Sequence, residues 1–81
     1  MTFEEFRATK KPCSDALWDM IKDALPGFTA PREACHEYAD FCLLYEEGGL
    51  FWVHAWWYAP LSYQTLEEAE PELYKWHQEF A

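Results

Sequence analysis

The chain has 81 residues, a formal net charge of −9 and an aromatic share of 20%. This length favours a single domain over 1–81, and so many aromatic side chains supply enough apolar area for a core without metal or disulfide. No stretch approaches the roughly 20 apolar residues of a membrane-spanning helix, and the acidic first residues do not resemble a basic leader, so we expect a cytoplasmic protein. The negative charge disfavours direct nucleic-acid binding, because it repels phosphate backbones.

The charge is unevenly distributed along the chain. Residues 1–32 carry five acidic and five basic side chains, whereas residues 33–81 carry ten acidic side chains and one basic side chain, Lys75. An electrostatic field of this kind favours contact with a basic partner surface. The alternative, that the acidity only keeps a very aromatic protein soluble, stays open.

The first helix is predicted over about 3–9. Thr2 and Glu5 have the spacing of a capping box, and Pro12 disfavours the helical conformation in the residue before it. Further along, the segment from Pro31 to Glu37 is consistent either with a short helix or turn, or with an extended approach to a strand.

A second helix is predicted over about 15–25. Leu17, Trp18, Ile21 and Leu25 recur at helical spacing and form its apolar face. The opposite face carries an acidic stripe of Asp15, Asp19 and Asp23. Such a stripe is usually solvated, but it would also suit an arginine-rich partner.

The centre of the chain predicts an antiparallel β-hairpin over about 38–46 and 50–58. Two apolar runs flank Gly48 and Gly49, which supply the positive φ that a tight turn needs. Both hairpin faces are apolar: one carries Cys42, Leu44, Phe51, Val53, Ala55 and Trp57, and the other carries Phe41, Leu43, Tyr45, Trp52, His54, Trp56 and Tyr58. Either helices cover both faces, or one face contacts something outside the chain.

A third helix is predicted over about 66–80, after Pro60 has ended the second strand. Thr65 opens this helix with a capping box, and its early turns are rich in acidic residues, namely Glu67, Glu68, Glu70 and Glu72. Pro71 is expected to kink the helix or to shorten it to a start near Glu70. Together these elements predict a small α+β domain.

No pattern of residues indicates catalysis or a cofactor. The cysteines and histidines lack the paired spacing of a zinc site, and no glycine-rich phosphate loop is present. His54 lies in a strand between Trp52 and Trp56 and is interpreted as a member of an aromatic cluster. A concave pocket at His54 would instead favour a small ligand-binding domain or an enzyme.

We therefore expect a non-enzymatic acidic protein that inhibits a basic, nucleic-acid-handling partner by charge mimicry. The contacts expected to carry this binding are Asp15, Asp19, Asp23, Glu46, Glu47, Glu67, Glu68, Glu70 and Glu72, with Trp52 and Trp56 as apolar anchors. The alternative is a homodimer that pairs through the aromatic hairpin face.

In size and acidity the chain is similar to small phage and mobile-element inhibitors, such as anti-CRISPR and anti-restriction proteins. It is also similar to immunity proteins and antitoxins that cap basic nucleases. This resemblance is one of composition: it implies an inhibitor, and it assigns no residues.

Overall fold

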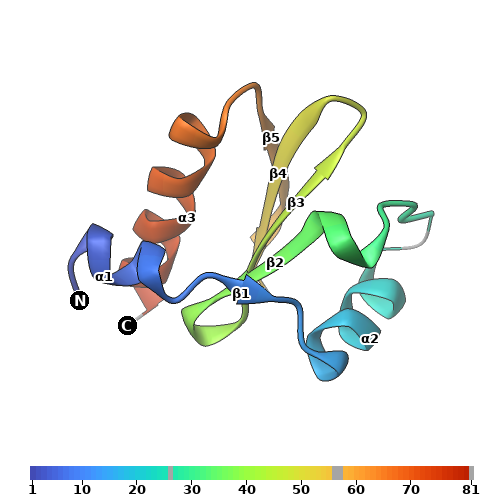
Figure 1. Ribbon diagram of the computed structural model, residues 1–81, viewed down its shortest axis with the longest axis horizontal. Helices are drawn as coiled ribbons and strands as arrows, with labels where there is room; N and C mark the ends of the chain where they lie inside the picture. The colour runs from blue at the N-terminus through green and yellow to red at the C-terminus, as the bar shows by residue number, and fades with distance from the viewer. Residues whose placement is uncertain (26, 56–57, 81) are drawn as a thin grey trace.

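The computed structural model describes residues 1–25, 27–55 and 58–80, and for Phe41, Tyr58, Ala59 and Phe80 it describes the backbone alone. These segments form three α-helices, two 3₁₀ turns and one five-stranded antiparallel sheet (Figure 1). The predicted α+β class is confirmed. Within these segments, no helix has the length and apolarity that a membrane crossing requires.

The three α-helices lie within a residue of the predicted ranges: α1 spans Phe3–Ala8, α2 spans Asp15–Ala24 and α3 spans Leu66–Phe80. Their starts follow local capping chemistry. The Thr2 hydroxyl accepts a hydrogen bond from the Glu5 amide at 3.1 Å, and the Glu5 carboxylate accepts one from the Thr2 amide at 2.8 Å. The Ser14 hydroxyl accepts from the Leu17 amide at 3.3 Å and caps α2 in the same way.

The expectation that Pro71 delays the start of α3 is wrong. The helix begins at Leu66, where the Thr65 hydroxyl accepts a hydrogen bond from the Glu68 amide at 3.2 Å, and it continues through Pro71. Proline leaves the carbonyl four residues earlier, that of Glu67, without its helical hydrogen bond, and the proline ring crowds the same carbonyl. Because both Glu67 and Pro71 are exposed, water can satisfy that carbonyl.

The sheet has the strand order β1-β2-β3-β4-β5, and every pair of neighbours is antiparallel. The strands are β1 (Lys11–Pro12), β2 (Cys35–Tyr38), β3 (Cys42–Glu47), β4 (Leu50–Ala55) and β5 (Tyr58–Tyr63). The predicted hairpin is formed by β3 and β4, where Glu47 pairs with Leu50 across a two-residue turn. Gly48 and Gly49 have φ angles of +63° and +77°, as a turn of this kind requires.

The predicted first strand of the hairpin is too long, because the chain reverses between Tyr38 and Cys42. Residues 39–41 form a 3₁₀ turn in which Asp40 has a φ of +56°. Aspartate tolerates this left-handed conformation better than most residues. Before this turn, the uncertain segment contains both predicted alternatives, a 3₁₀ turn at Arg32–Ala34 followed by strand β2.

The second strand of the hairpin is also shorter than predicted, because β4 ends at Ala55, and the prediction that Pro60 interrupts strand structure is wrong. Strand β5 runs through Pro60 and pairs with β4. It lies at the edge of the sheet, and its register with β4 shifts between Val53 and Ala55. Edge strands and irregular positions are where a residue without an amide donor is tolerated, since no ladder hydrogen bond needs it.

Where their side chains are described, both faces of the hairpin are covered by helices, as the first alternative expects. In Figure 1, α1 and α3 lie on one side of the strands and α2 lies on the other. The α3-side core contains Phe6, Tyr38, Cys42, Leu44, Val53, Ala55, Ala69, Leu73 and Trp76. The α2-side core contains Cys13, Leu17, Ile21, Ala30, Cys35, Leu43 and Tyr45.

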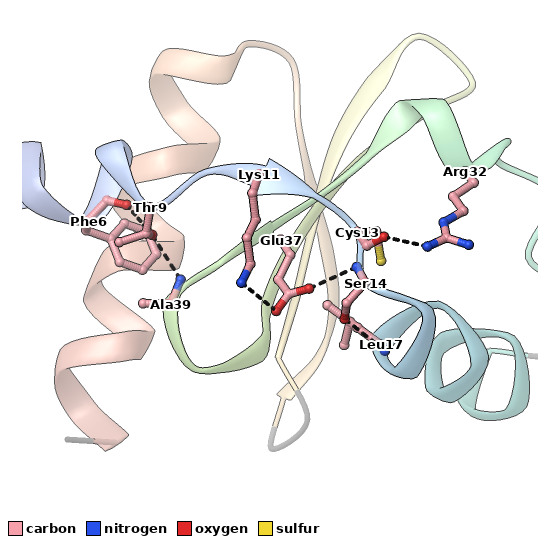
Figure 2. A network of polar contacts seen from close by, with 9 residues as sticks. All are labelled: Phe6, Thr9, Lys11, Cys13, Ser14, Leu17, Arg32, Glu37 and Ala39. Carbon is pink, nitrogen blue, oxygen red and sulfur yellow. Dashed lines mark hydrogen bonds and ion pairs between the residues drawn. The ribbon is translucent and has the colours of Figure 1, made fainter.

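The chain passes from one side of the sheet to the other along β1, and Figure 2 shows the polar contacts that hold this crossing. The buried Glu37 carboxylate accepts from the Ser14 amide at 3.0 Å and lies 3.9 Å from the Lys11 ammonium. The Thr9 hydroxyl accepts from the Ala39 amide at 3.0 Å, at the end of α1. Strand β2 is thereby tied to the chain just before and just after β1.

We predict that Gly48→Ala destabilises the fold by about 1 kcal/mol, because an alanine pays the steric cost of a left-handed backbone. A Cβ atom at this position would meet nothing within 4 Å, so the effect is conformational rather than a clash. The matched variant Gly48→Asn should be close to neutral, since Asn-Gly suits this turn. Urea unfolding measures both. Equal urea midpoints for Gly48→Ala and Gly48→Asn would contradict the left-handed backbone conformation at residue 48.

Candidate functional site

The predicted acidic contacts do not form one surface. Asp15, Asp19 and Asp23 lie on α2, whereas Glu67, Glu68, Glu70 and Glu72 lie on α3, across the sheet. A partner that contacts one group therefore faces away from the other. The two groups are best considered separately.

The acidic stripe on α2 is exposed and partly neutralised. The Asp15 carboxylate forms an ion pair with Arg32, and Asp19 lies 3.8 Å from the Lys22 ammonium. Such exposed pairs contribute little to stability, but they lower the net charge of the stripe. Asp23 is the member of the stripe for which no ion pair occurs among the described residues.

A second set of carboxylates lies on the first turns of α3 and on β3, the strand that α3 contacts. Glu67 and Glu68 are exposed, and the burial of Tyr63, followed by the charges of Glu72 and Glu68, raises the pKa of the Tyr63 hydroxyl. Tyr63 pairs with Phe51, and Phe51 pairs with the exposed Glu46, so these residues form one row across the sheet. We call Glu46, Glu67, Glu68 and Glu72 the anionic surface.

No lysine or arginine forms an ion pair with the anionic surface, although Arg7 lines the same small hollow as Glu67, and all six basic residues lie in the described part of the chain. Four of them form ion pairs elsewhere, with Asp15, Asp19, Glu37 and Glu70. None of the ion pairs among the described residues includes Glu46, Glu67, Glu68 or Glu72. The anionic surface therefore keeps its charge.

Glu70 is a correction to the predicted contacts, because its carboxylate is buried. Its carboxylate accepts a hydrogen bond from the Tyr38 hydroxyl at 2.6 Å. It also forms an ion pair with Arg7, in which Oε1 lies 3.2 Å from the arginine Nε. A carboxylate enclosed in this way joins α3 to β2 and α1 and is not free to contact a partner. The prediction failed because helical spacing alone did not show which side of α3 would face the sheet.

Glu47 also serves the fold. Its carboxylate accepts from both the amide and the hydroxyl of Thr29, and so holds the segment after α2 against the hairpin. Its backbone carbonyl accepts from the indole nitrogen of Trp52 at 3.1 Å. Glu47 is therefore a weaker candidate for partner contact than Glu46.

The aromatic hairpin face is largely enclosed where the structure describes it. Leu43 and Tyr45 are buried under α2, and the half-buried Trp52 lies parallel to Tyr45 with ring centroids 6.3 Å apart. Trp56, the second predicted anchor, lies outside the described residues. The described members of this face thus provide no exposed aromatic patch for the homodimer alternative.

His54 lines an apolar hollow of about 200 Å³ between α2 and the hairpin. Its other lining residues are Leu17, Met20, Ile21, Ala24, Leu43 and Ala55. Burial lowers the pKa of His54 from its ordinary value, which favours the neutral imidazole, and no described group hydrogen-bonds to it. Met20 and Ala24 were missed in the sequence, although each follows an apolar residue of α2 by three positions and so widens its apolar face.

The cysteines are poor candidates for nucleophiles. Burial raises the pKa of Cys35 and that of Cys42 to about 12, so both thiols are protonated at neutral pH. Among the described residues, no group of three His, Cys, Asp or Glu side chains has the geometry to hold a metal ion.

One further polar pair was not anticipated from the sequence. His77 is buried in α3, and its Nε2 atom lies 2.7 Å from the Asp40 carboxylate. The left-handed backbone of Asp40 directs this contact, which connects the turn before β3 to α3. The pair is structural, because it joins two elements.

Comparison of the chain with protein-family models, with curated proteins and with solved structures finds no match.

We predict that the protein loses stability as the pH rises above about 8.5. In the unfolded chain cysteine and tyrosine titrate near 8.5 and 10, whereas burial raises the pKa of Cys35, Cys42 and Tyr45 to about 12 in the fold. Between these values the folded state binds more protons than the unfolded state, so the free energy of unfolding falls with rising pH. Urea midpoints at several pH values test this.

Cys42→Ala provides the control for the alkaline effect, because it removes one of the three buried groups. The variant should lose less stability than the parent protein over the same rise in pH. Identical pH dependence in the two proteins would contradict the assignment of this effect to buried thiols.

Proposed function

We propose that this protein is a non-enzymatic interaction protein whose anionic surface binds a cationic surface of a partner protein. The observation that carries the proposal is that Glu67, Glu68 and Glu72 on α3 and Glu46 on the neighbouring β3 form none of the ion pairs of the described residues. The net charge of −9 adds a long-range field of the same sign.

Repulsion among these carboxylates slightly destabilises the protein, and a cationic partner would relieve that repulsion. Glu68 and Glu72 are four residues apart on one helix, a spacing at which like charges destabilise the helix by a few tenths of a kcal/mol. The positive end of the helix dipole offsets part of this repulsion for Glu67 and Glu68 in the first turn. Lysine or arginine from a partner would compensate all four charges.

Charge mimicry is the mechanism that this surface supports. Carboxylates held on a helix and a strand would occupy the sites where a nucleic-acid-handling protein binds phosphates, and they would thereby inhibit it. Individually exposed ion pairs contribute only about 0.2–1 kcal/mol, so affinity would come from several contacts together and from electrostatic steering of the encounter.

A matched pair of variants tests the anionic surface. The triple change Glu46→Gln, Glu67→Gln and Glu72→Gln removes three charges and leaves the helix-capping Glu68 in place. The control removes three negative charges from α2 by the changes Asp15→Asn, Asp19→Asn and Asp23→Asn. In pull-downs from lysate at about 50 mM salt, the first variant should lose the basic partners that the parent recovers, and the control should retain them.

Salt provides the second arm of this test. Raising the salt to about 500 mM should release partners that are held by charge, because it shortens the Debye length to a few ångströms. Partners that resist this salt concentration, or that are lost equally with both triple variants, would count against the proposal.

A second candidate function is binding of a small ligand in the hollow beside His54. The observation that favours it is a neutral imidazole, free of described hydrogen-bond partners, among six apolar lining residues. Such a site suits a small apolar molecule that carries one hydroxyl or other hydrogen-bonding group. This function is independent of the anionic surface, since α2 and α3 lie on opposite faces of the sheet.

Phenol is a suitable probe of the hollow. We expect it to shift the NMR signals of His54 and of the other lining residues, with a Kd on the order of millimolar for so few atoms. Ala24→Phe should block the shifts by filling the hollow, and Ala16→Phe, an exposed change elsewhere on α2, should not. Shifts that survive Ala24→Phe would rule out binding at this place.

A further inference from the structure

We infer that Cys13 and Cys35 form an intrachain disulfide when the protein folds in the presence of a small disulfide oxidant such as oxidised glutathione. The strand register places the two residues together. Lys11 pairs with Glu37 and Pro12 pairs with His36, so the same register carried one residue further sets Cys13 opposite Cys35. Residues directly opposite in an antiparallel pair have Cα atoms about 4.5–5.5 Å apart, within the range that a disulfide spans.

Contacts on either side hold the two cysteine backbones in place. The Arg32 guanidinium donates to the Cys13 carbonyl at 2.9 Å (Figure 2), and the Cys35 amide donates to the Arg32 carbonyl. One residue further, the Ser14 amide donates to the Glu37 carboxylate at 3.0 Å. Arg32 thus contacts both cysteines, and the chain after β1 has little freedom to move away from β2.

Both side chains also point to the same side of the sheet. Cys13 is 3% exposed and Cys35 is 1% exposed, and both belong to the α2-side core. The pKa of Cys35 is raised first by burial and then by the nearby Cys13 sulfur, as expected for neighbouring thiols. A disulfide would replace two thiols within one apolar cluster.

The third cysteine is separated from this pair by the sheet. Cys42 is buried in the α3-side core, at the position where β3 pairs with Tyr38. The disulfide is therefore specific to one of the three possible cysteine pairs, and Cys42 is a natural internal control.

The reaction is a thiol–disulfide exchange. One cysteine thiolate attacks a sulfur of oxidised glutathione and releases one glutathione thiolate. The second cysteine then attacks the protein sulfur of the mixed disulfide and releases the other glutathione. Two protein thiols are oxidised to one disulfide, oxidised glutathione is reduced to two thiols, and those thiols take up the two protons.

Burial of the two thiols makes this exchange slow in the folded protein and faster during folding. In the folded protein the thiols are enclosed, and the raised pKa of Cys13 and Cys35 keeps them protonated, so oxidation of the native state is slow. During folding the thiols are accessible and more readily ionised. The disulfide would close the loop that contains α2 and would fasten α2 to the sheet.

The first experiment identifies the pair. The protein is unfolded in urea, refolded in a mixture of reduced and oxidised glutathione, alkylated and cut after glutamate. Cleavage after Glu33, Glu37 and Glu46 puts Cys35 in residues 34–37 and Cys42 in residues 38–46. We expect a cross-link between the peptide containing Cys13 and residues 34–37, with Cys42 alkylated. A cross-link to Cys42, or three alkylated cysteines, would overturn the inference.

The second experiment measures the consequence for stability. The refolded, oxidised protein should unfold at a higher urea concentration than the same sample after reduction by dithiothreitol. This shift should persist in Cys42→Ala and vanish in Cys13→Ala and in Cys35→Ala. For each variant the oxidised sample is compared with the reduced sample of the same variant, which corrects for the effect of the substitution itself on stability. A shift that disappears in Cys42→Ala would contradict the assigned pair.

Discussion

The structure depends on one constraint: the hairpin of β3 and β4 is apolar on both faces and must be covered on both. Helices α1 and α3 cover one face and α2 covers the other, so the chain has to pass around the sheet between α1 and α2. It does so along β1, the short strand at one edge. The buried Glu37 carboxylate holds the chain in this path. It forms an ion pair with Lys11 in β1 and accepts a hydrogen bond from the Ser14 amide just after β1.

The same constraint explains the distribution of surface charge. Lys11 and Arg7 form ion pairs with the buried carboxylates of Glu37 and Glu70, which would otherwise be costly in an apolar interior. Arg32 and Lys22 pair with the acidic stripe of α2. Neither Lys10 nor Lys75 forms an ion pair with Glu46, Glu67, Glu68 or Glu72 among the described residues, and the charge of these carboxylates is the basis of the proposed interaction.

The anionic surface and the hollow beside His54 belong to different layers of the fold, and the cysteine pair lies at the crossing between those layers. The sheet separates the two cores, and this separation keeps the three features apart. Substitutions in α3 that change the anionic surface leave the α2-side core untouched, and changes at Ala24 leave the anionic surface untouched. The proposed functions and the disulfide are therefore physically separable.

The three helices, the glycine turn of the hairpin and the need to cover two apolar faces could all be predicted from the amino-acid sequence, because capping residues, positive φ and side-chain periodicity act over a few neighbouring residues. Three features became visible only in the folded protein: Glu70 is enclosed, β5 continues through Pro60 and His54 lines a hollow. Each of these outcomes depends on which element packs against which, and contacts between residues far apart in the chain leave no local pattern.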